Sequence, residues 1–283
     1  MPPILTQTAG PDGKPCLHID LDAFEAPMKE ALRRAAIFLG YAFHASEIAP
    51  LKSISLKAPI VLDVGVPDPI SPADRKGYQT EFTQWAIGQG LIEIDQSYHR
   101  YLVSALDALA DTDDFLMSQS SPGPRKPNLS NTWKVHEQLY AKLDQQSAEH
   151  RVESGYLRSL VNTRNCLAHD SGIVTRRRMV DGNSTMSIRW PGRDMVMIDH
   201  YGRRTLLQRD REHRVRAEDV GKKLSIEEVV RERHFEEGDR IVLSQSDLSE
   251  IIFFYQVLVI KVKSEMYRIV GEKLTLPIRP DLL

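Results

Sequence analysis

The sequence predicts a mainly α-helical protein: an antiparallel helical bundle with a small antiparallel β appendage. Apolar residues recur at helical spacing over long stretches before residue 172 and again beyond residue 244. Between these stretches, short runs rich in β-branched residues alternate with turn residues, which is typical of strands. Helices that are apolar on one face bury that face most simply by packing against one another.

Four segments are expected along the 283 residues. Residues 1–15 are rich in proline and glycine and are expected to form a flexible tail. Residues 16–172 are expected to form the helical bundle, and residues 173–243 a β-rich basic appendage. Residues 244–283 are then expected to form a helix that packs back on the bundle. A chain of this length with 41% hydrophobic residues can bury a sizeable core.

The first helix is expected to begin where Asp20 or Asp22 caps it and to end near His44. The same start resembles the opening strand of Y-family DNA polymerases, in which these two carboxylates would hold magnesium. No later acidic motif follows at a suitable distance, so a helix cap is the preferred interpretation. Residues 45–70 carry short β-like runs between prolines and are expected to form an extended excursion or a small hairpin.

A second, long helix is expected to start at Ser71, the N-cap, with Pro72 in its first turn, and to reach about Asp111. Gly88 and Gly90 lower its helical propensity and mark a place for a kink or a break. The adjacent His99 and Arg100 on this helix are expected on a solvated face.

A polar connection over residues 118–131 follows, and Thr132 is expected to cap a shorter helix that reaches about residue 146. The next helix, residues 156–172, carries the motif discussed below. Beyond Gly172 the pattern changes to β. The expected elements there are a hairpin of residues 173–180 and 185–190, a strand over 193–198, a loop or short helix over 203–216, and a last helix from Ser244 or Ser246 to about Val270.

Composition favours a cytoplasmic protein without a membrane segment. Only Cys16 and Cys166 are present, which argues for a reducing compartment and against a disulfide framework. The N-terminus lacks the pattern of a signal peptide, and the longest apolar run is too short to span a bilayer. Residues 151–220 hold 14 basic against 9 acidic residues, and such a block attracts phosphate. Solvated surface charge is the simpler explanation of that block.

Residues 156–172 arrange their side chains in two stripes. The apolar stripe consists of Leu157, Leu160, Val161, Leu167 and Ala168, and Arg164 lies in its middle, where an unpaired charge is costly. The neighbouring polar stripe consists of Arg158, Asn162, Asn165 and His169. A helix that only fills a core needs neither an arginine in its apolar face nor this polar ladder.

The run Arg164-Asn165-Cys166-Leu167-Ala168-His169, followed by Asp170 and Gly172, resembles the signature of the HEPN superfamily. Members are small helical bundles, usually dimers, and many are metal-independent ribonucleases whose paired motifs form one cleft. The resemblance implies a homodimeric endoribonuclease of this type, acting as a toxin or antiviral effector, with an antitoxin or a regulatory protein as a further partner. The alternative is a catalytically inactive HEPN-like module that binds nucleic acid or protein.

The residue types suit RNA cleavage without a metal. Histidine exchanges protons near neutral pH, and arginine offers a planar fork of donors to phosphate. Asn165, one turn before His169, can orient the imidazole or bind phosphate. A five-residue step rotates by about 140° on an ideal helix, so Arg164 and His169 do not share a face. Either the last turn unwinds before Gly172, or a two-fold axis completes the site.

Each of these residues also has a purely structural explanation. His169 can simply end a helix, and Arg164 can pair with a core carboxylate. Asn165 can be an ordinary surface residue, and Cys166 is expected in the core and not as a nucleophile. No Cys/His spacing for zinc and no glycine-rich phosphate loop is present, so neither a metal nor a cofactor is expected.

Four residues are expected to bind RNA: Arg158, Asn162, Arg176 and Arg178. On a strand, alternation would point Arg176 and Arg178 to the same face, close to His169 along the chain. They would then add affinity for the RNA backbone without sequence preference. The alternative is an edge strand that exposed charge protects against aggregation.

Overall fold

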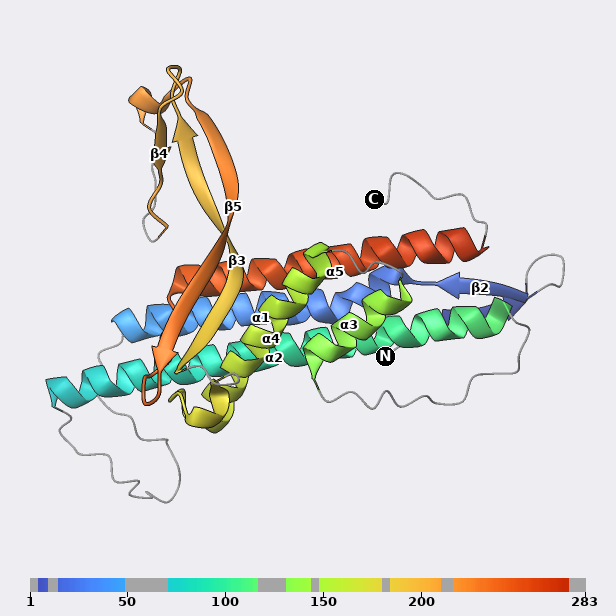
Figure 1. Cartoon of the computed structure of the whole chain (residues 1–283), viewed down its shortest axis with the longest axis horizontal. Coiled ribbons are helices and arrows are strands. Elements are labelled where there is room, and N and C mark those ends of the chain that lie inside the picture. Colours follow the sequence, from blue (N-terminus) through green and yellow to red (C-terminus); the bar gives the residue numbers. More distant parts are fainter. Residues whose placement is uncertain are drawn as a thin grey trace.

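The computed structural model describes residues 5–9, 15–48, 71–116, 131–143, 148–179, 184–209 and 216–274. Within these ranges it is mainly helical, with a small antiparallel sheet that rises from the bundle (Figure 1), as predicted. The helices are α1 (Leu21–Ile48), α2 (Pro72–Leu116), α3 (Thr132–Lys142), α4 (Ala148–His169) and α5 (Gln245–Leu274).

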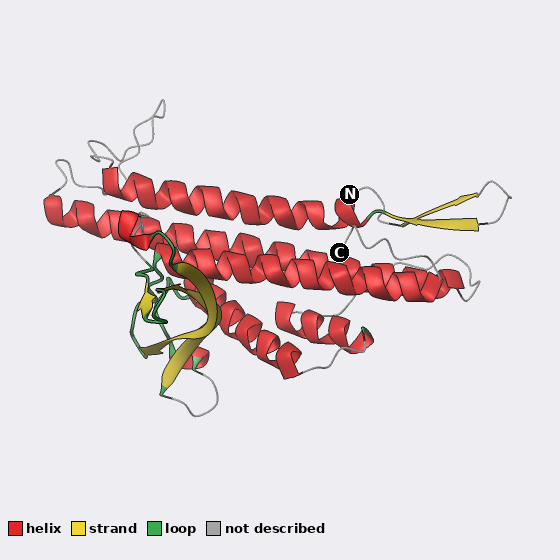
Figure 2. Cartoon of the chain, turned by 90° about the horizontal axis from the view of Figure 1, so that it is seen from above, coloured by secondary structure: helices red, strands yellow, loops and turns green. Residues whose placement is uncertain are grey.

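The three longest helices, α1, α2 and α5, pack against one another. α1 packs against α2 and α5 and runs in the opposite direction to both (Figure 1). The shorter helices α3 and α4 pack against each other and against α2, and both lie on the same side of the three long helices (Figure 2). Their inward faces make one continuous apolar core that includes Tyr98, Leu139, Leu157 and Leu258. In the described part of the chain, no helix is long and apolar enough to cross a membrane.

The predicted helix starts are confirmed where side-chain caps are present. Asp20 Oδ1 accepts a hydrogen bond from the amide of Ala23 at 2.8 Å, and Ser71 Oγ accepts one from the amide of Asp74 at 3.1 Å. Ser244 caps α5 in the same way. The cap predicted at Thr132 is wrong, because Asn131 precedes the first turn of α3 without a side-chain capping bond.

α2 continues through Gly88 and Gly90 without a break. Both glycines serve as close crossing points instead. A Cβ on Gly88 would lie 3.3 Å from the Cβ of Leu167 on α4, and one on Gly90 would lie 2.9 Å from Leu39 Cδ1 on α1. Because neither glycine has a side chain, α4 and α1 can approach α2 closely. Helix packing therefore explains why α2 contains two residues of low helical propensity.

At the N-terminus, the prediction of a flexible tail over residues 1–15 is wrong for its described part. β1 (Leu5–Ala9) pairs antiparallel with β2 (Pro15–Ile19). The expected excursion begins later than predicted, because α1 extends to Ile48. The rest of that excursion, residues 49–70, and most of the connection before α3, residues 117–130, lie outside the described residues.

The β appendage is present with a different pairing from the one predicted. β3 (Thr185–Ile198) pairs along its whole length with β5 (Lys223–Glu236), and its outer end also pairs with the short β4 (Arg204–Leu206). The predicted hairpin between residues 173–180 and 185–190 is therefore wrong. Residues 185–190 and 193–198, predicted as two strands, belong to the single strand β3.

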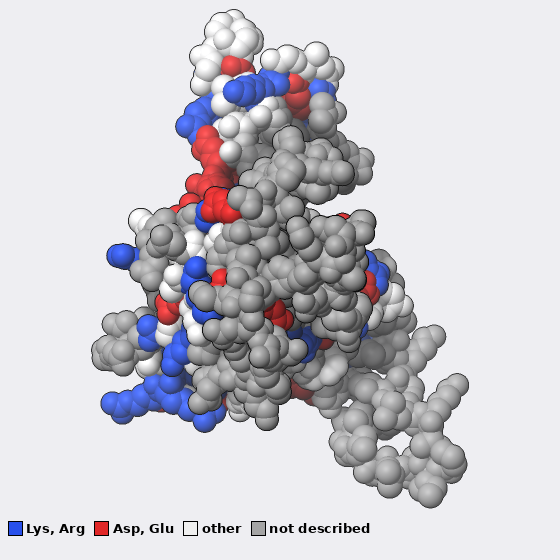
Figure 3. Space-filling view, turned by 90° about the vertical axis from the view of Figure 1, so that its right-hand side faces the viewer, with Lys and Arg blue, Asp and Glu red and all other residues white. Residues whose placement is uncertain are grey.

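The inner half of this sheet belongs to the core. Met186, Ile188 and Trp190 of β3 are buried against α4 and α5, and the indole nitrogen of Trp190 donates to Glu250 at 2.9 Å. The outer half projects as an arm on which Leu206, Leu224 and Ile226 are exposed. Figure 3 shows the arm above the bundle, with uncharged surface at its tip and charged side chains below.

Candidate active site at the end of the motif helix

α4 remains helical up to His169. The amides of Asp170 and Gly172 both donate to the carbonyl of Cys166, at 2.9 and 3.1 Å. Ser171 and Gly172 then adopt positive φ angles of 55° and 73°, which reverse the chain directly after the helix. The last turn does not unwind before Gly172. The expectation that unwinding would place Arg164 beside His169 is therefore wrong.

Arg164 points from α4 toward α2. Its Nη2 donates to Asp95 Oδ2 at 2.5 Å, and the Asp95 side chain is only 2% exposed. The Arg164 side chain is 21% exposed, so the pair lies at the edge of the core. Asp95 Oδ1 and Arg164 Nε are also buried, and neither has a hydrogen-bond partner among the described residues. The ion pair therefore leaves one acceptor and one donor unused at this edge.

His99 lies one helical turn beyond Asp95 and is half-buried. Burial lowers its pKa, Asp95 acts in the opposite direction, and Arg100 and Arg164 lower it further. The prediction of a solvated pair fits Arg100, which is exposed, better than His99. The sequence analysis did not predict that Arg164 pairs with Asp95 or that His99 lies next to this ion pair. The available signal was the Asp95/His99 spacing of four residues, which places both on one face of α2.

His169 is exposed at the last residue of α4 and makes no hydrogen bond to another described residue. Asn165 is half-buried, and its carbonyl accepts a hydrogen bond from Arg178 Nη2 at 3.2 Å. Since the helix is intact, Arg164 and His169 are about 140° apart around its axis. Within one chain the helix holds Arg164 toward α2 and leaves His169 exposed.

The three arginines after the motif form a 3₁₀ turn, Arg176–Arg178, and not a strand. The prediction that Arg176 and Arg178 alternate onto one face of a strand is therefore wrong. The Asp170 carboxylate contacts this turn, because it accepts hydrogen bonds from Arg177 and from Arg178 Nε, the latter at 2.6 Å. Burial of Asp170 by itself would raise its pKa, but these hydrogen bonds outweigh burial and lower it.

The four residues predicted to bind RNA separate into two pairs. Arg178, with a side chain only 14% exposed, and Asn162, whose amide donates to the Arg178 carbonyl at 2.8 Å, are used within the chain. Arg176 is exposed and makes no ion pair with another described residue. Arg158 is also exposed, with its guanidinium 5.5 Å from the ring centre of Trp133. The second pair is available to a ligand.

Cys166 is a core residue, as predicted. It has no exposed surface, and its thiol donates to the carbonyl of Ile173 at 3.2 Å. Burial raises its pKa to about 11, and the nearby Asp170 carboxylate acts in the same direction. The thiol therefore stays protonated at neutral pH, which disfavours a nucleophilic role.

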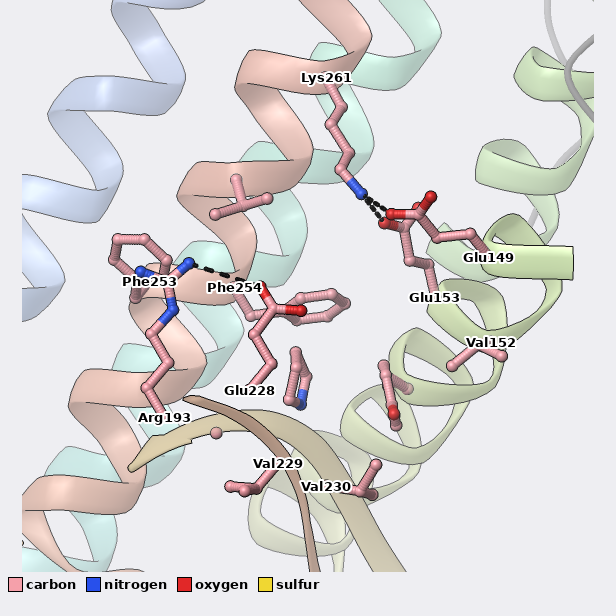
Figure 4. A pocket seen from close by; sticks show the side chains of 14 residues that line it. Glu149, Val152, Glu153, Arg193, Glu228, Val229, Val230, Phe253, Phe254 and Lys261 are labelled. Carbon is pink, nitrogen blue, oxygen red and sulfur yellow. Dashed lines mark hydrogen bonds and ion pairs between the residues drawn. The ribbon is translucent and has the colours of Figure 1, made fainter. Parts of the chain in front are cut away.

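A cleft of about 440 Å³ lies along the other half of α4, between that helix, α5 and the sheet. In Figure 4, Lys261 reaches Glu149 and Glu153 on one side of the cleft, and Arg193 approaches Glu228 on the other. Phe253, next to Arg193, and Val229 on the sheet supply apolar wall. This cleft involves neither Arg164 nor His169.

Comparison of the chain with models of known protein families, with curated proteins and with solved structures found no match.

Proposed function

We propose that this protein is a metal-independent endoribonuclease of the HEPN type that cleaves RNA in a cleft between two copies of the chain. One observation carries the proposal: Arg164 is anchored on a buried carboxylate, while His169 stands in solvent at the end of the same helix. A fixed guanidinium can bind a phosphate oxygen with little loss of conformational entropy. An exposed imidazole can reach a ribose hydroxyl or a leaving oxygen.

Two protomers provide what a single protomer lacks. Transfer of the 2′-hydroxyl proton needs a base, and departure of the 5′-oxygen needs an acid, so two histidines serve better than one. A two-fold axis near the end of α4 would supply His169 and Arg164 twice. The products would be a 2′,3′-cyclic phosphate and a 5′-hydroxyl. Arg176 and Arg158, both exposed, would hold the RNA backbone.

An apolar surface at the same end of the bundle supports the dimer. Phe38 and Tyr41 on α1, with Phe82 and Trp85 on α2, are exposed side by side along a groove of about 380 Å³. Trp85 lies one turn before Gly88, the point where α2 meets α4. Exposed apolar patches of this kind commonly mark interfaces, and a second copy placed here would bring the two motif ends toward each other.

The second candidate is a catalytically silent module that binds nucleic acid or a protein partner. The Arg164–Asp95 ion pair favours it, because a buried pair can be explained by packing alone. The two candidates differ in outcome. The silent module would bind RNA without forming product and would impose no growth penalty on expression.

The test compares His169→Ala and Arg164→Lys with the wild-type protein on end-labelled tRNA and mRNA, without added magnesium. Both variants should fold, because His169 is exposed and lysine keeps a positive charge beside Asp95. Cleavage should fall by at least about 100-fold in each, the usual loss for a general acid–base or a charge-stabilising group. His200→Ala, an exposed histidine on the arm, is the matched control and should cleave normally.

Full cleavage by folded His169→Ala protein would refute the proposal, as would an absolute requirement for added magnesium. RNA binding without any product from the wild-type protein would favour the silent module. The product ends distinguish this mechanism from metal-dependent hydrolysis, because only a 2′,3′-cyclic phosphate requires attack by the ribose hydroxyl.

A further inference from the structure

A second group of histidines lies at the opposite end of α4 from the motif. His136 on α3 and His150 and Glu153 on α4 are all buried. One nitrogen from each imidazole and one oxygen of the carboxylate lie within 4.8 Å of one another. The two imidazole rings are stacked in parallel, with centres 5.0 Å apart. Three potential metal ligands therefore face a common point in the core.

His136 supplies the observation that points to a ligand. Its side chain has no exposed surface, and its Nδ1 is 3.0 Å from the hydroxyl of Tyr98. The other ring nitrogen, Nε2, is buried with no hydrogen-bond partner among the described residues. Leaving such a group unsatisfied destabilises the fold. If Nδ1–H donates to Tyr98, Nε2 presents a lone pair toward the cluster, as in histidines that bind metals.

Tyr140 adds a second polar atom at the same place. Its ring is 3.4 Å from the ring of His150 and 4.6 Å from that of His136, measured between centres. Its hydroxyl is buried and has no hydrogen-bond partner in the described part of the chain. A phenol oxygen or a water molecule can complete a four-coordinate site.

The charges around the cluster suit a cation despite the presence of Lys261. Lys261 Nζ donates to Glu153 Oε1 at 2.6 Å and also pairs with Glu149, so two carboxylates offset its charge. Glu153 Oε2 faces His150 Nδ1 at 3.9 Å, which leaves this oxygen directed at the cluster. Lys261 then acts as the outer partner that orients a ligating carboxylate.

We propose that His136, His150 and Glu153 bind one zinc ion, with Tyr140 or water as the fourth ligand. Two imidazoles and one carboxylate favour zinc and related transition ions over magnesium or calcium, which prefer oxygen. Ligands of tetrahedral zinc are roughly 3.3 Å apart, so side-chain shifts of about 1 Å complete the site. The ion ties α3 to α4. Glu153 and Lys261 also line the cleft of Figure 4, which gives the ion a route of entry.

This role is separate from RNA cleavage, because the cluster and the motif lie in different halves of α4. It differs from the expectation of no metal, which rested on the lack of a recognisable Cys/His spacing. His136 precedes His150 by 14 residues and lies on another helix, so only the packing of α3 on α4 brings them together.

The test uses the full chain, stripped with EDTA and dialysed, and then titrated with Zn²⁺. One Zn²⁺ per chain should bind, and a free concentration near 100 times the Kd should raise the Tm by about 5–10 °C. Co²⁺ should give the visible bands of a four- or five-coordinate site without the near-ultraviolet band of thiolate ligands. A folded wild-type protein that neither binds Zn²⁺ nor gains thermal stability would overturn the proposal.

The variants His150→Gln and Glu153→Gln should each weaken zinc binding by at least about 100-fold, since each removes a direct ligand. His99→Gln replaces a half-buried histidine outside the cluster and should bind zinc normally. Circular dichroism checks folding, and Glu153→Gln serves if His150→Gln does not fold. Equal zinc affinity in the wild type and in folded Glu153→Gln protein would mean that the ion binds elsewhere, and the proposal would be wrong.

Discussion

The two ends of α4 carry similar side chains in opposite environments. Near the start, His150 and Glu153 are buried beneath α3 beside a stacked imidazole. At the end, His169 is exposed, and Arg164 lies at the edge of the core, paired with a carboxylate of α2. The first end resembles a ligand set closed from water, and the second resembles a site open to a large substrate.

This difference indicates that the burial of a histidine decides whether its imidazole can bind a metal ion or exchange protons with a substrate. A buried imidazole that stays neutral can bind a metal or stack, but it cannot readily exchange protons with a substrate. An exposed imidazole at a helix end has the reverse properties. The zinc experiments above test the buried end of α4, and the four predictions below test the motif end, starting with the largest expected effect.

Arg164→Ala should lower the free energy of unfolding by about 3–5 kcal/mol, because it leaves Asp95 charged, buried and unpaired. Urea denaturation measures this loss. The double variant Arg164→Gln/Asp95→Asn should recover most of it, since two neutral amides replace the ion pair. A loss below about 1 kcal/mol in Arg164→Ala would contradict this prediction, because the Arg164–Asp95 ion pair would then contribute as little to stability as an exposed pair.

Gly88→Val should destabilise the fold by about 1–3 kcal/mol, because its side chain would collide with Leu167 where α4 crosses α2. RNA cleavage should fall as well, since the shift moves the end of α4. Gly155→Ala is the matched control on α4, where an added Cβ meets nothing within 4 Å. It should stabilise the helix by up to about 1 kcal/mol. Equal stability of the two variants in thermal melts would contradict this prediction.

Arg176→Gln should weaken RNA binding a few-fold and flatten the dependence of log K on log salt by about 0.7, the value for one phosphate contact with a single strand. Its stability should be unchanged, because the side chain is exposed. Arg178→Gln should instead lower the stability, since it breaks hydrogen bonds to Asp170 and Asn165. Fluorescence anisotropy at several salt concentrations, with a urea titration of each variant, separates the two roles.

The smallest expected effect concerns acid. The pKa of Asp170 is lower in the folded protein than its ordinary value near 3.8, so the folded state favours the charged carboxylate. Its contribution to stability is therefore complete above that value and is lost as the pH falls from about 4 through the lowered pKa. Asp170→Asn should be less stable than the wild type at pH 7, and the difference should shrink below pH 4. A difference that stays constant with pH would contradict the prediction.

Residues close in sequence made much of the fold predictable. Helix starts at Asp20, Ser71 and Ser244 depend on a side chain and an amide three residues apart, so local chemistry determines them. Apolar periodicity likewise indicated the buried face of the motif helix through Leu157 and Leu160. The mainly helical class follows from these local signals.

Contacts between residues that are distant in the chain could not be predicted from the sequence. β3 pairs with β5, which begins at Lys223, and the residues directly after the motif form a 3₁₀ turn and not the expected partner strand. Many pairings satisfy the same alternation of side chains, so the pattern alone does not select one.

The sequence by itself determined the helices, their apolar faces and the motif that ends at His169. Only the tertiary structure decided what surrounds the polar side chains. It placed Asp95 against Arg164 across a separation of 69 residues and gathered His136, His150 and Glu153 in the core. The physical reason is that helical periodicity is a local property of the backbone, whereas the partner of a buried charge or imidazole depends on which helices pack together.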